Sequence, residues 1–424
     1  MKRYLSGIDW VINTLDYLGR RRSGVGNISQ IVLELLGRPE EKDLRKRLDN
    51  CLKAIPALSG YPKRAVNLCP YWKVSGRSYP LALNVYNLDN DSGFTEALSI
   101  FRDQLDKPFR NKREHLVFNL IYCRDKTYFG MVFDHRLIDA RGAEAFLSML
   151  AQEPQELSPL NSLEEPSNLN RWLDKFRSGR KINRVFLHLT AGKPRVLTLR
   201  QNSSNSRLSV FAFSAQESRV IADNSYKSAG YLMLMPYLLA KSIVCLHSIF
   251  EQRKILPADY LIPVSVDSRA SDLVKQEPFF NHLSFFLFRI KSEEAHDFAV
   301  VLDKIKKQMY EQVKIGLPEA IKEASFLIRI APLPLVDFFM RVMTKGETAS
   351  FAFSFLGESV FAPDTFLGAK VCNLLHLPRI PLPPGLGIFF NQYQGRLNAT
   401  LSSVKGLLSE SEVKQVDEYL KGLA

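Results

Sequence analysis

The stretch YFGMVFDHRLIDARG, residues 128–142, changes from a strand pattern to a helix pattern within a few positions. Before it, LVFNLIYC at 116–123 is a second β-rich run, and the polar turn at 124–127 joins the two runs into a predicted hairpin. After it, residues 143–152 have apolar side chains at helical spacing. His135 and Asp139 therefore stand at a strand-to-helix junction, where side chains commonly face a cleft.

Outward from this junction, apolar patterning predicts a mixture of strands and helices. Strands are expected at 208–213 and 260–266, a strand or buried apolar run at 29–36, and a strong apolar run at 281–290. Helices are expected at 40–55, 230–250 and 294–313. Segment 230–250 has nearly the length of a membrane span. It contains Lys241 in its middle, together with Pro236 and His247, and a central lysine is costly in lipid. We therefore expect a core helix there and an α/β fold.

The length of the chain predicts two domains, because 424 residues exceed what one hydrophobic core usually holds. The composition turns to Pro, Ser, Asn and Glu at 153–170, and it turns polar again in QNSSNSR at 201–207. We place the domain boundary in the second of these segments. This gives an N-terminal lobe of residues 1–200, which carries the motif, and a C-terminal lobe of residues 201–424.

The formal net charge is +13, and the basic residues gather in clusters. These clusters are Arg20, Arg21 and Arg22; Arg110, Lys112 and Arg113; and Arg177, Arg180, Lys181 and Arg184. A charge run is usually a solvated face, although such clusters also attract anionic ligands, lipids or nucleic acid. Since no zinc-finger, RNP-type or basic-zipper pattern accompanies them, we expect no nucleic-acid partner.

The cysteines and the first residues indicate the compartment. The five cysteines are far apart and form no C-x-x-C pair, which is typical of reduced thiols in a cytoplasmic protein. MKRYLSGIDW has no apolar run behind its basic start, so we expect no cleaved secretory signal. GVGNIS at 24–29 lacks the preceding strand and the acidic residue of a dinucleotide site. His135 and Asp139 lack further ligands nearby, so no metal site is expected.

An H-x-x-x-D pair alone is weak evidence, but its surroundings are more specific. FDHRLIDARG at 133–142 resembles the H-x-x-x-D-G signature of the chloramphenicol acetyltransferase-like superfamily, which includes peptide-synthetase condensation domains and wax ester synthases. Further stretches agree with the family in order and spacing: LSGIDWVINTLD at 5–16, LIPVSVDSR at 261–269 followed by PFFNHLSFFLFRI at 278–290, and PPGLGIFFNQYQGRLNATLSS at 383–403. Together they cover most of the chain.

Some positions depart from the family pattern. Asp134 stands where many members have a first histidine, and Ala140 stands where they have glycine after the aspartate. Phe355, in FSFLGES at 353–359, replaces a common asparagine, and the Asn-Asp pair of wax ester synthases is not found near Gly230. These departures leave the resemblance to the superfamily intact and bear only on which of its subfamilies the chain resembles.

The resemblance implies two chloramphenicol acetyltransferase-like α/β sandwich lobes with an active-site tunnel between them. It implies transfer of an acyl group from coenzyme A or a phosphopantetheine carrier to a hydroxyl or amine, without a covalent intermediate or a permanently bound cofactor. His135 is the candidate general base, because imidazole titrates near neutral pH. Asp139 looks like a triad partner, but the resemblance implies that it pairs with an arginine, for which Arg269 is the best match.

The resemblance also places the donor to the oxyanion in the opposite lobe. Asn281, Ser284 and Ser354 are the candidates, and the sequence does not choose among them.

The acceptor is expected to be a hydrophobic alcohol or amine, because Phe and Leu crowd segment 324–343. That segment is alternatively part of a core or, with Arg329 and Arg341, a peripheral contact with a membrane surface. Two further functions remain open. One is a condensation-like protein acting on carrier-bound substrates, whose basic clusters dock an acidic acyl carrier protein. The other is a non-catalytic binding or scaffold relative, which Asp134 and Ala140 make plausible.

Overall fold

The computed structural model describes residues 2–74, 79–88, 93–152, 172–189, 205–269, 273–343, 349–380 and 382–422. Within these ranges the strands form two six-stranded sheets and one three-stranded sheet. The strands are β1 (Lys2–Tyr4), β2 (Ile28–Leu36), β3 (Tyr61–Arg64), β4 (Pro70–Lys73), β5 (Ala82–Asn87), β6 (Leu116–Tyr122), β7 (Thr127–Asp134), β8 (Ser206–Ala212), β9 (Asp259–Asp267), β10 (Leu283–Lys291), β11 (Ala352–Glu358), β12 (Thr365–Phe366), β13 (Ala369–Pro378), β14 (Leu386–Tyr393) and β15 (Arg396–Val404).

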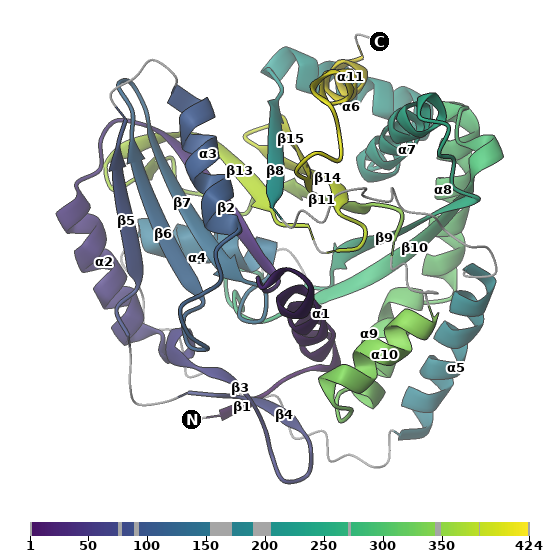
Figure 1. The fold of residues 1–424 in the computed structure, drawn as a ribbon, viewed down its shortest axis with the longest axis horizontal. Helices are drawn as coiled ribbons and strands as arrows, with labels where there is room; N and C mark the ends of the chain where they lie inside the picture. The colour runs from purple at the N-terminus through teal and green to yellow at the C-terminus, as the bar shows by residue number, and fades with distance from the viewer. Residues whose placement is uncertain are drawn as a thin grey trace.

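The α-helices of the described residues are shown in Figure 1. They are α1 (Gly7–Ser23), α2 (Glu41–Ala54), α3 (Gly93–Leu105), α4 (Ala140–Ala151), α5 (Trp172–Leu189), α6 (Ala215–Ala229), α7 (Leu234–Gln252), α8 (Phe298–Lys314), α9 (Leu317–Ile328), α10 (Leu333–Met343) and α11 (Glu410–Lys421). The expected α/β class is confirmed.

The N-terminal lobe is built on the sheet β12-β13-β2-β7-β6-β5. The predicted hairpin is present as β6 and β7, paired from Leu116↔Phe133 to Tyr122↔Thr127. Helices α2 and α4 cover one face, with a core that includes Leu44, Phe118 and Phe146, and α3 covers the other. Strand β7 ends at Asp134. The next residue, His135, therefore lies at the rim of this sheet.

The C-terminal lobe is built on the sheet β10-β9-β11-β14-β15-β8. The expected apolar helix is α7, whose core neighbours lie on strands such as β9 and β14. By length and composition α7 alone among the described helices is apolar enough to cross a membrane, but most of its residues are buried inside this lobe. Its hydrophobicity is explained by this core, and the prediction of a core helix is confirmed.

The two large sheets do not follow a division of the chain at residue 200, because two strands from after that residue belong to the N-terminal sheet. Strands β12 and β13 come from the second half of the sequence, yet β13 pairs with β2 along Lys370↔Leu36 to Pro378↔Ser29. This pairing satisfies an edge of β2 that would otherwise have unpaired backbone groups. The first part of the expected boundary segment 201–207, residues 201–204, lies outside the described residues.

Two element boundaries differ from the sequence-based expectation because a capping aspartate decides them. Helix α8 begins at Phe298 rather than 294, since Asp297 Oδ1 accepts from the backbone N–H groups of Ala299 and Val300. Helix α4 begins at Ala140 rather than 143, since Asp139 caps it. The second cap matters for function because it places Asp139 at a helix terminus beside the cavity described below.

Candidate active site

His135 stands where the chain leaves β7 and turns toward α4. Its backbone N–H donates to the Asn27 carbonyl at 3.1 Å. Its carbonyl accepts from Asn281 Nδ2 at 2.7 Å. The first contact comes from the loop before β2 and the second from the segment that enters β10. The backbone of His135 is therefore held from both lobes.

The imidazole of His135 lines a cavity of about 400 Å³ between the two large sheets. Among the described residues, Nδ1 has no hydrogen-bond partner. Burial lowers the pKa of His135 from 6.5 to about 4, although the carboxylates of Asp139 and Asp134 act in the opposite direction. The ring is therefore neutral at neutral pH and has a lone pair that accepts a proton.

Asp139 caps α4 and pairs with Arg269 across the lobes. Arg269 Nη2 lies 2.7 Å from Oδ1 and 2.9 Å from Oδ2 of the carboxylate, and the two side chains are 3% and 1% exposed. The carboxylate also accepts from the Gly142 N–H at 2.8 Å and from the His282 N–H at 3.2 Å. No hydrogen bond joins it to the His135 imidazole within the described residues. This is the pairing that the family resemblance implies, and it leaves the carboxylate no free role as an orienting group.

The ion pair continues along one wall of the cavity. Arg269 Nη2 also lies 2.7 Å from Asp267 Oδ2, and Arg141 Nε lies 3.8 Å from the same oxygen. Burial lowers the pKa of Arg269, but the hydrogen bonds and charges of Asp267 and Asp139 outweigh burial and raise it. Since positive and negative side chains alternate, neither arginine is left as an uncompensated buried charge.

Gly142 permits the close approach of α4 to the C-terminal lobe. A Cβ atom at this position would lie 1.9 Å from the Pro278 carbonyl oxygen. Beside it, the Phe280 N–H donates to the Leu137 carbonyl at 2.6 Å, and Ile138 forms an isolated parallel bridge with Phe280. The close approach therefore depends on the glycine at 142, whereas Ala140 occupies the first helical position.

Asp134, which stands where many family members have a histidine, is a buried anchor for the motif. Its Oδ2 accepts from Arg136 Nη2 at 2.6 Å and from His115 Nδ1 at 2.9 Å. Burial alone raises the pKa of the Asp134 carboxyl, but Arg136 and His115 outweigh it and hold that pKa below its ordinary value. His115 Nε2 faces the Gly60 carbonyl at 2.8 Å, so both ring nitrogens of His115 have hydrogen-bond partners.

The remainder of the cavity wall is mainly apolar. The apolar lining residues are Ala140, Met235, Val266, Leu283, Phe355, Leu356, Pro378, Phe389 and Phe390, and the remaining polar ones are Ser29, Ser265, Ser354 and His376. Phe355, which replaces a common asparagine of the family, thus contributes an apolar ring to the cavity.

The structure separates the three candidates for the oxyanion donor. Ser284 Oγ donates to the Pro318 carbonyl at 2.6 Å and does not line the cavity. Asn281 uses its amide hydrogens on the His135 carbonyl and on Asp9 Oδ1, so it positions the base rather than facing the cavity. In this structure neither side chain directs a free donor into the cavity. Ser354 lines the cavity, and its Oγ lies 3.4 Å from Ser265 Oγ.

A buried pair beside the cavity was missed by the sequence analysis. His376 Nε2 lies 2.8 Å from Glu144 Oε1, and Glu144 Oε2 accepts from the Val360 N–H at 2.8 Å. His376 has no potential partner near it in the sequence, so residue spacing gives no sign of this pair. The pairing of β13 with β2 brings it to α4. The available signal was Glu144 itself, a carboxylate on the apolar face of a helix.

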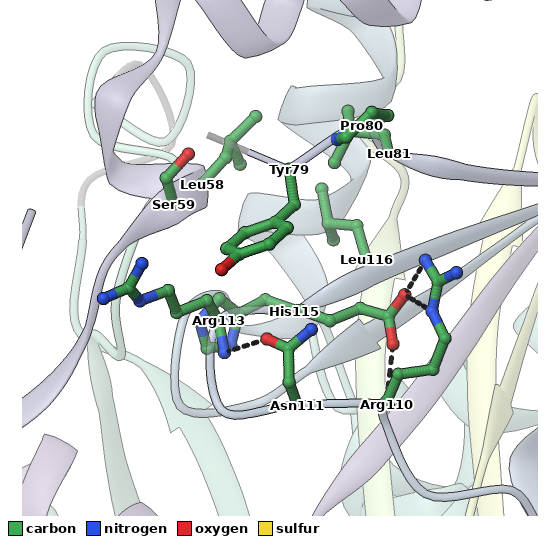
Figure 2. Close-up of a pocket in the computed structure, with 11 residues that line it drawn as sticks. Leu58, Ser59, Tyr79, Pro80, Leu81, Arg110, Asn111, Arg113, His115 and Leu116 are labelled. Atoms are coloured by element: carbon green, nitrogen blue, oxygen red, sulfur yellow. Dashed lines mark hydrogen bonds and ion pairs between the residues drawn. The ribbon is translucent and has the colours of Figure 1, made fainter. Parts of the chain in front are cut away.

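A smaller cavity of about 280 Å³ lies in the N-terminal lobe, on the His115 side of Asp134. Arg110 Nε donates to Glu114 Oε1 at 2.7 Å, and Figure 2 shows Arg113 extending away from Arg110. The ring nitrogens of His115 are already bonded, so this cavity offers no reactive group comparable to His135.

Segment 324–343 does not line the larger cavity. It therefore gives no support for a hydrophobic acceptor, and that expectation now rests on the apolar lining instead. Arg329 is 3% exposed, and its Nη1 donates to the Leu5 carbonyl at 3.1 Å, so it does not face a membrane. The side chain of Arg341 lies outside the described residues.

Comparisons with known proteins give the fold a name. The sequence matches no protein-family model, and no curated protein sequence is similar enough to count as a relative. Solved structures do match. The first condensation domain of the calcium-dependent antibiotic synthetase, in complex with a substrate analogue, superposes with a TM-score of 0.71 at 13% identity, covering 100% of this chain and 97% of that one.

Two transferases match over similar lengths. TRI3 trichothecene 15-O-acetyltransferase from Fusarium sporotrichioides has a TM-score of 0.69 at 12% identity, covering 100% of this chain and 95% of that one. The wax ester synthase/diacylglycerol acyltransferase from Marinobacter aquaeolei VT8 has a TM-score of 0.63 at 12% identity, covering 99% and 98%. This chain therefore has the fold of the chloramphenicol acetyltransferase-like superfamily of acyltransferases and condensation domains.

Proposed function

We propose that this chain is an acyltransferase that moves an acyl group from a coenzyme A or phosphopantetheine thioester to a hydroxyl or amine, with His135 as general base. The observation that carries the proposal is the neutral imidazole of His135, which lines the cavity between the lobes while its backbone is held from both. A cytoplasmic location is proposed with it, in keeping with five cysteines that are all free thiols.

In the proposed reaction the acceptor gives its proton to the imidazole of His135 as its oxygen or nitrogen attacks the thioester carbonyl carbon. The C–S bond then breaks, and the imidazolium returns the proton to the departing thiolate. Positioned proton transfer contributes about 10²- to 10⁴-fold, and orientation and oxyanion stabilisation supply the remainder. We assign the oxyanion contact to the Ser354 hydroxyl.

Direct transfer is favoured over a covalent intermediate. An activated serine or cysteine would be hydrogen-bonded to the base, and none of the described residues is bonded to the His135 ring. The apolar wall of the cavity favours a hydrophobic acceptor. As donor, a coenzyme A thioester is supported by the match to the starter condensation domain of rhizomide synthetase, whose structure contains C8-CoA and Leu-SNAC, with a TM-score of 0.66 at 11% identity.

A second candidate is condensation on carrier-bound substrates, which the condensation-domain matches favour. Thiol release from a panel of acyl thioesters, offered as free coenzyme A thioesters and on acyl carrier proteins, distinguishes the two. We expect His135→Ala to reduce release at least about 10²-fold with an unchanged unfolding transition. Activity within a few-fold of the unmodified protein would remove the proposal and favour a binding or scaffold role.

A further inference from the structure

The three-stranded sheet β1-β4-β3 presents lysine and tyrosine side chains on one face. Its register aligns two rows across the strands, Lys2 with Lys73 and Tyr61, and Tyr4 with Tyr71 and Lys63. Trp72, between the rows on β4, points to the opposite face and is fully buried. Since side chains alternate along a strand, both rows lie on the face opposite Trp72, where Lys2 and Lys63 are exposed, Tyr61, Tyr71 and Lys73 are half-buried, and Tyr4 is buried. We call Tyr61, Lys63, Tyr71 and Lys73 the basic face.

Further cations extend the basic face at Tyr61. Lys112 Nζ lies 4.6 Å and Arg113 Cζ 5.2 Å from the centre of the Tyr61 ring. Burial raises the pKa of the Tyr61 phenol, but these cations with Lys73 and Lys63 outweigh it and lower that pKa. In the part of the chain that the structure describes, neither Lys63, Lys73, Lys112 nor Arg113 forms an ion pair. The surface is therefore positively charged.

The turn between β3 and β4 carries aliphatic side chains into solvent. Val66 is 104% exposed and Leu68 is 52% exposed. The turn is closed by two backbone bonds of 3.0 Å, from the Ala65 N–H to the Cys69 carbonyl and from the Leu68 N–H to the Ala65 carbonyl. Leu68 has φ 65°, a left-handed conformation that costs a bulky residue energy and suits asparagine or glycine better. Packing does not explain a leucine at this exposed position.

Helix α10 adds a second exposed apolar surface beside this turn. Phe338 and Phe339 are 53% and 54% exposed. The corner between α9 and α10 contacts the hairpin directly, since Arg64 donates to the Ile330 carbonyl and Arg329 Nη2 lies 3.2 Å from Cys69 Sγ. Figure 1 shows the β3–β4 hairpin and α10 along the lower edge of the molecule, with the hairpin projecting.

We propose that this edge docks on an anionic phospholipid bilayer, with the basic face against lipid phosphates and the hairpin tip and α10 in contact with the acyl region. Lysine supplies attraction to anionic headgroups, tyrosine suits the interface, and exposed aliphatic and phenylalanine side chains gain by leaving water. A nucleic acid would use the cations and rings but gives no partner to Val66 and Leu68. Docking goes beyond the proposed acyl transfer and does not depend on it.

Flotation of the full chain with vesicles tests the proposal. We expect binding to vesicles of phosphatidylcholine with phosphatidylglycerol, weaker binding to phosphatidylcholine alone, and loss of binding at high salt. Lys63→Glu with Lys73→Glu should lower the partition coefficient by about tenfold or more. Val66→Asp with Leu68→Asn should lower it similarly, and asparagine suits the left-handed backbone at 68, so the variant keeps the turn.

Matched controls lie on α6, at the opposite edge in Figure 1. Val220 is 50% exposed, and Val220→Asp and Lys227→Glu make the same kinds of change there; both should bind vesicles as the unmodified protein does. Equal binding to both kinds of vesicle, unchanged binding by the hairpin variant, or equal losses in the α6 controls would overturn the proposal. So would binding to single-stranded RNA, sensitive to the lysine variants, without binding to vesicles.

Discussion

The Asp139–Arg269 pair allows a sharp test of how the motif is held. Replacing Asp139 by Asn removes the charge that faces Arg269 but leaves an oxygen that can still cap α4, since asparagine is a good N-cap residue. Removing one partner of a buried pair costs about 3–5 kcal/mol. Arg269 keeps Asp267 at 2.7 Å as a second partner, so we expect a loss at the lower end of this range, about 3 kcal/mol.

The assay is urea unfolding of Asp139→Asn, Arg269→Ala and the double variant, with acyl transfer measured in parallel. The pair should show a coupling of about 1–3 kcal/mol. Asp303→Asn is the matched control, because both side chains of the Lys307–Asp303 pair are exposed and its loss should leave the unfolding transition nearly unchanged. Strictly additive losses, or an Asp139→Asn variant that loses activity while remaining as stable as the control, would refute the reasoning and favour a triad role for Asp139.

Other consequences of the site geometry are measurable. Because burial lowers the pKa of His135 to about 4, the active neutral form is lost only as pH falls through that value, so kcat/KM should stay level down to about pH 5; an inflection near pH 6.5 would show an ordinary histidine. Ser354→Ala should lower kcat about 10²-fold, whereas Ser284→Ala, whose hydroxyl is bonded to Pro318, should mainly lower thermal stability; the reverse pattern in steady-state kinetics would exchange their roles. Gly142→Ala should lower the free energy of unfolding by about 1–3 kcal/mol, since its Cβ would overlap the Pro278 carbonyl; an equally stable variant would show that the lobes have room to move.

The local helices and strands around the motif could be predicted from the sequence. Strand and helix patterns around residues 116–152 predicted the β6–β7 hairpin and α4, because alternation and helical spacing are local properties that one face of burial imposes. The family resemblance supplied the α/β lobes and identified Arg269 as the partner of Asp139. These inferences succeeded where short stretches carry the signal.

Contacts between distant segments were decided only by the tertiary structure. The sequence does not distinguish Ser284 from Ser354 as a donor. In the structure the Ser284 hydroxyl donates to the Pro318 carbonyl, whereas Ser354 lines the cavity. His376 meets Glu144 only because β13 returns to pair with β2, which also moves part of the second half into the N-terminal sheet. Hydrogen-bond partners, burial and the resulting pKa of His135 depend on atoms brought together across the two lobes, and residue spacing contains no record of them.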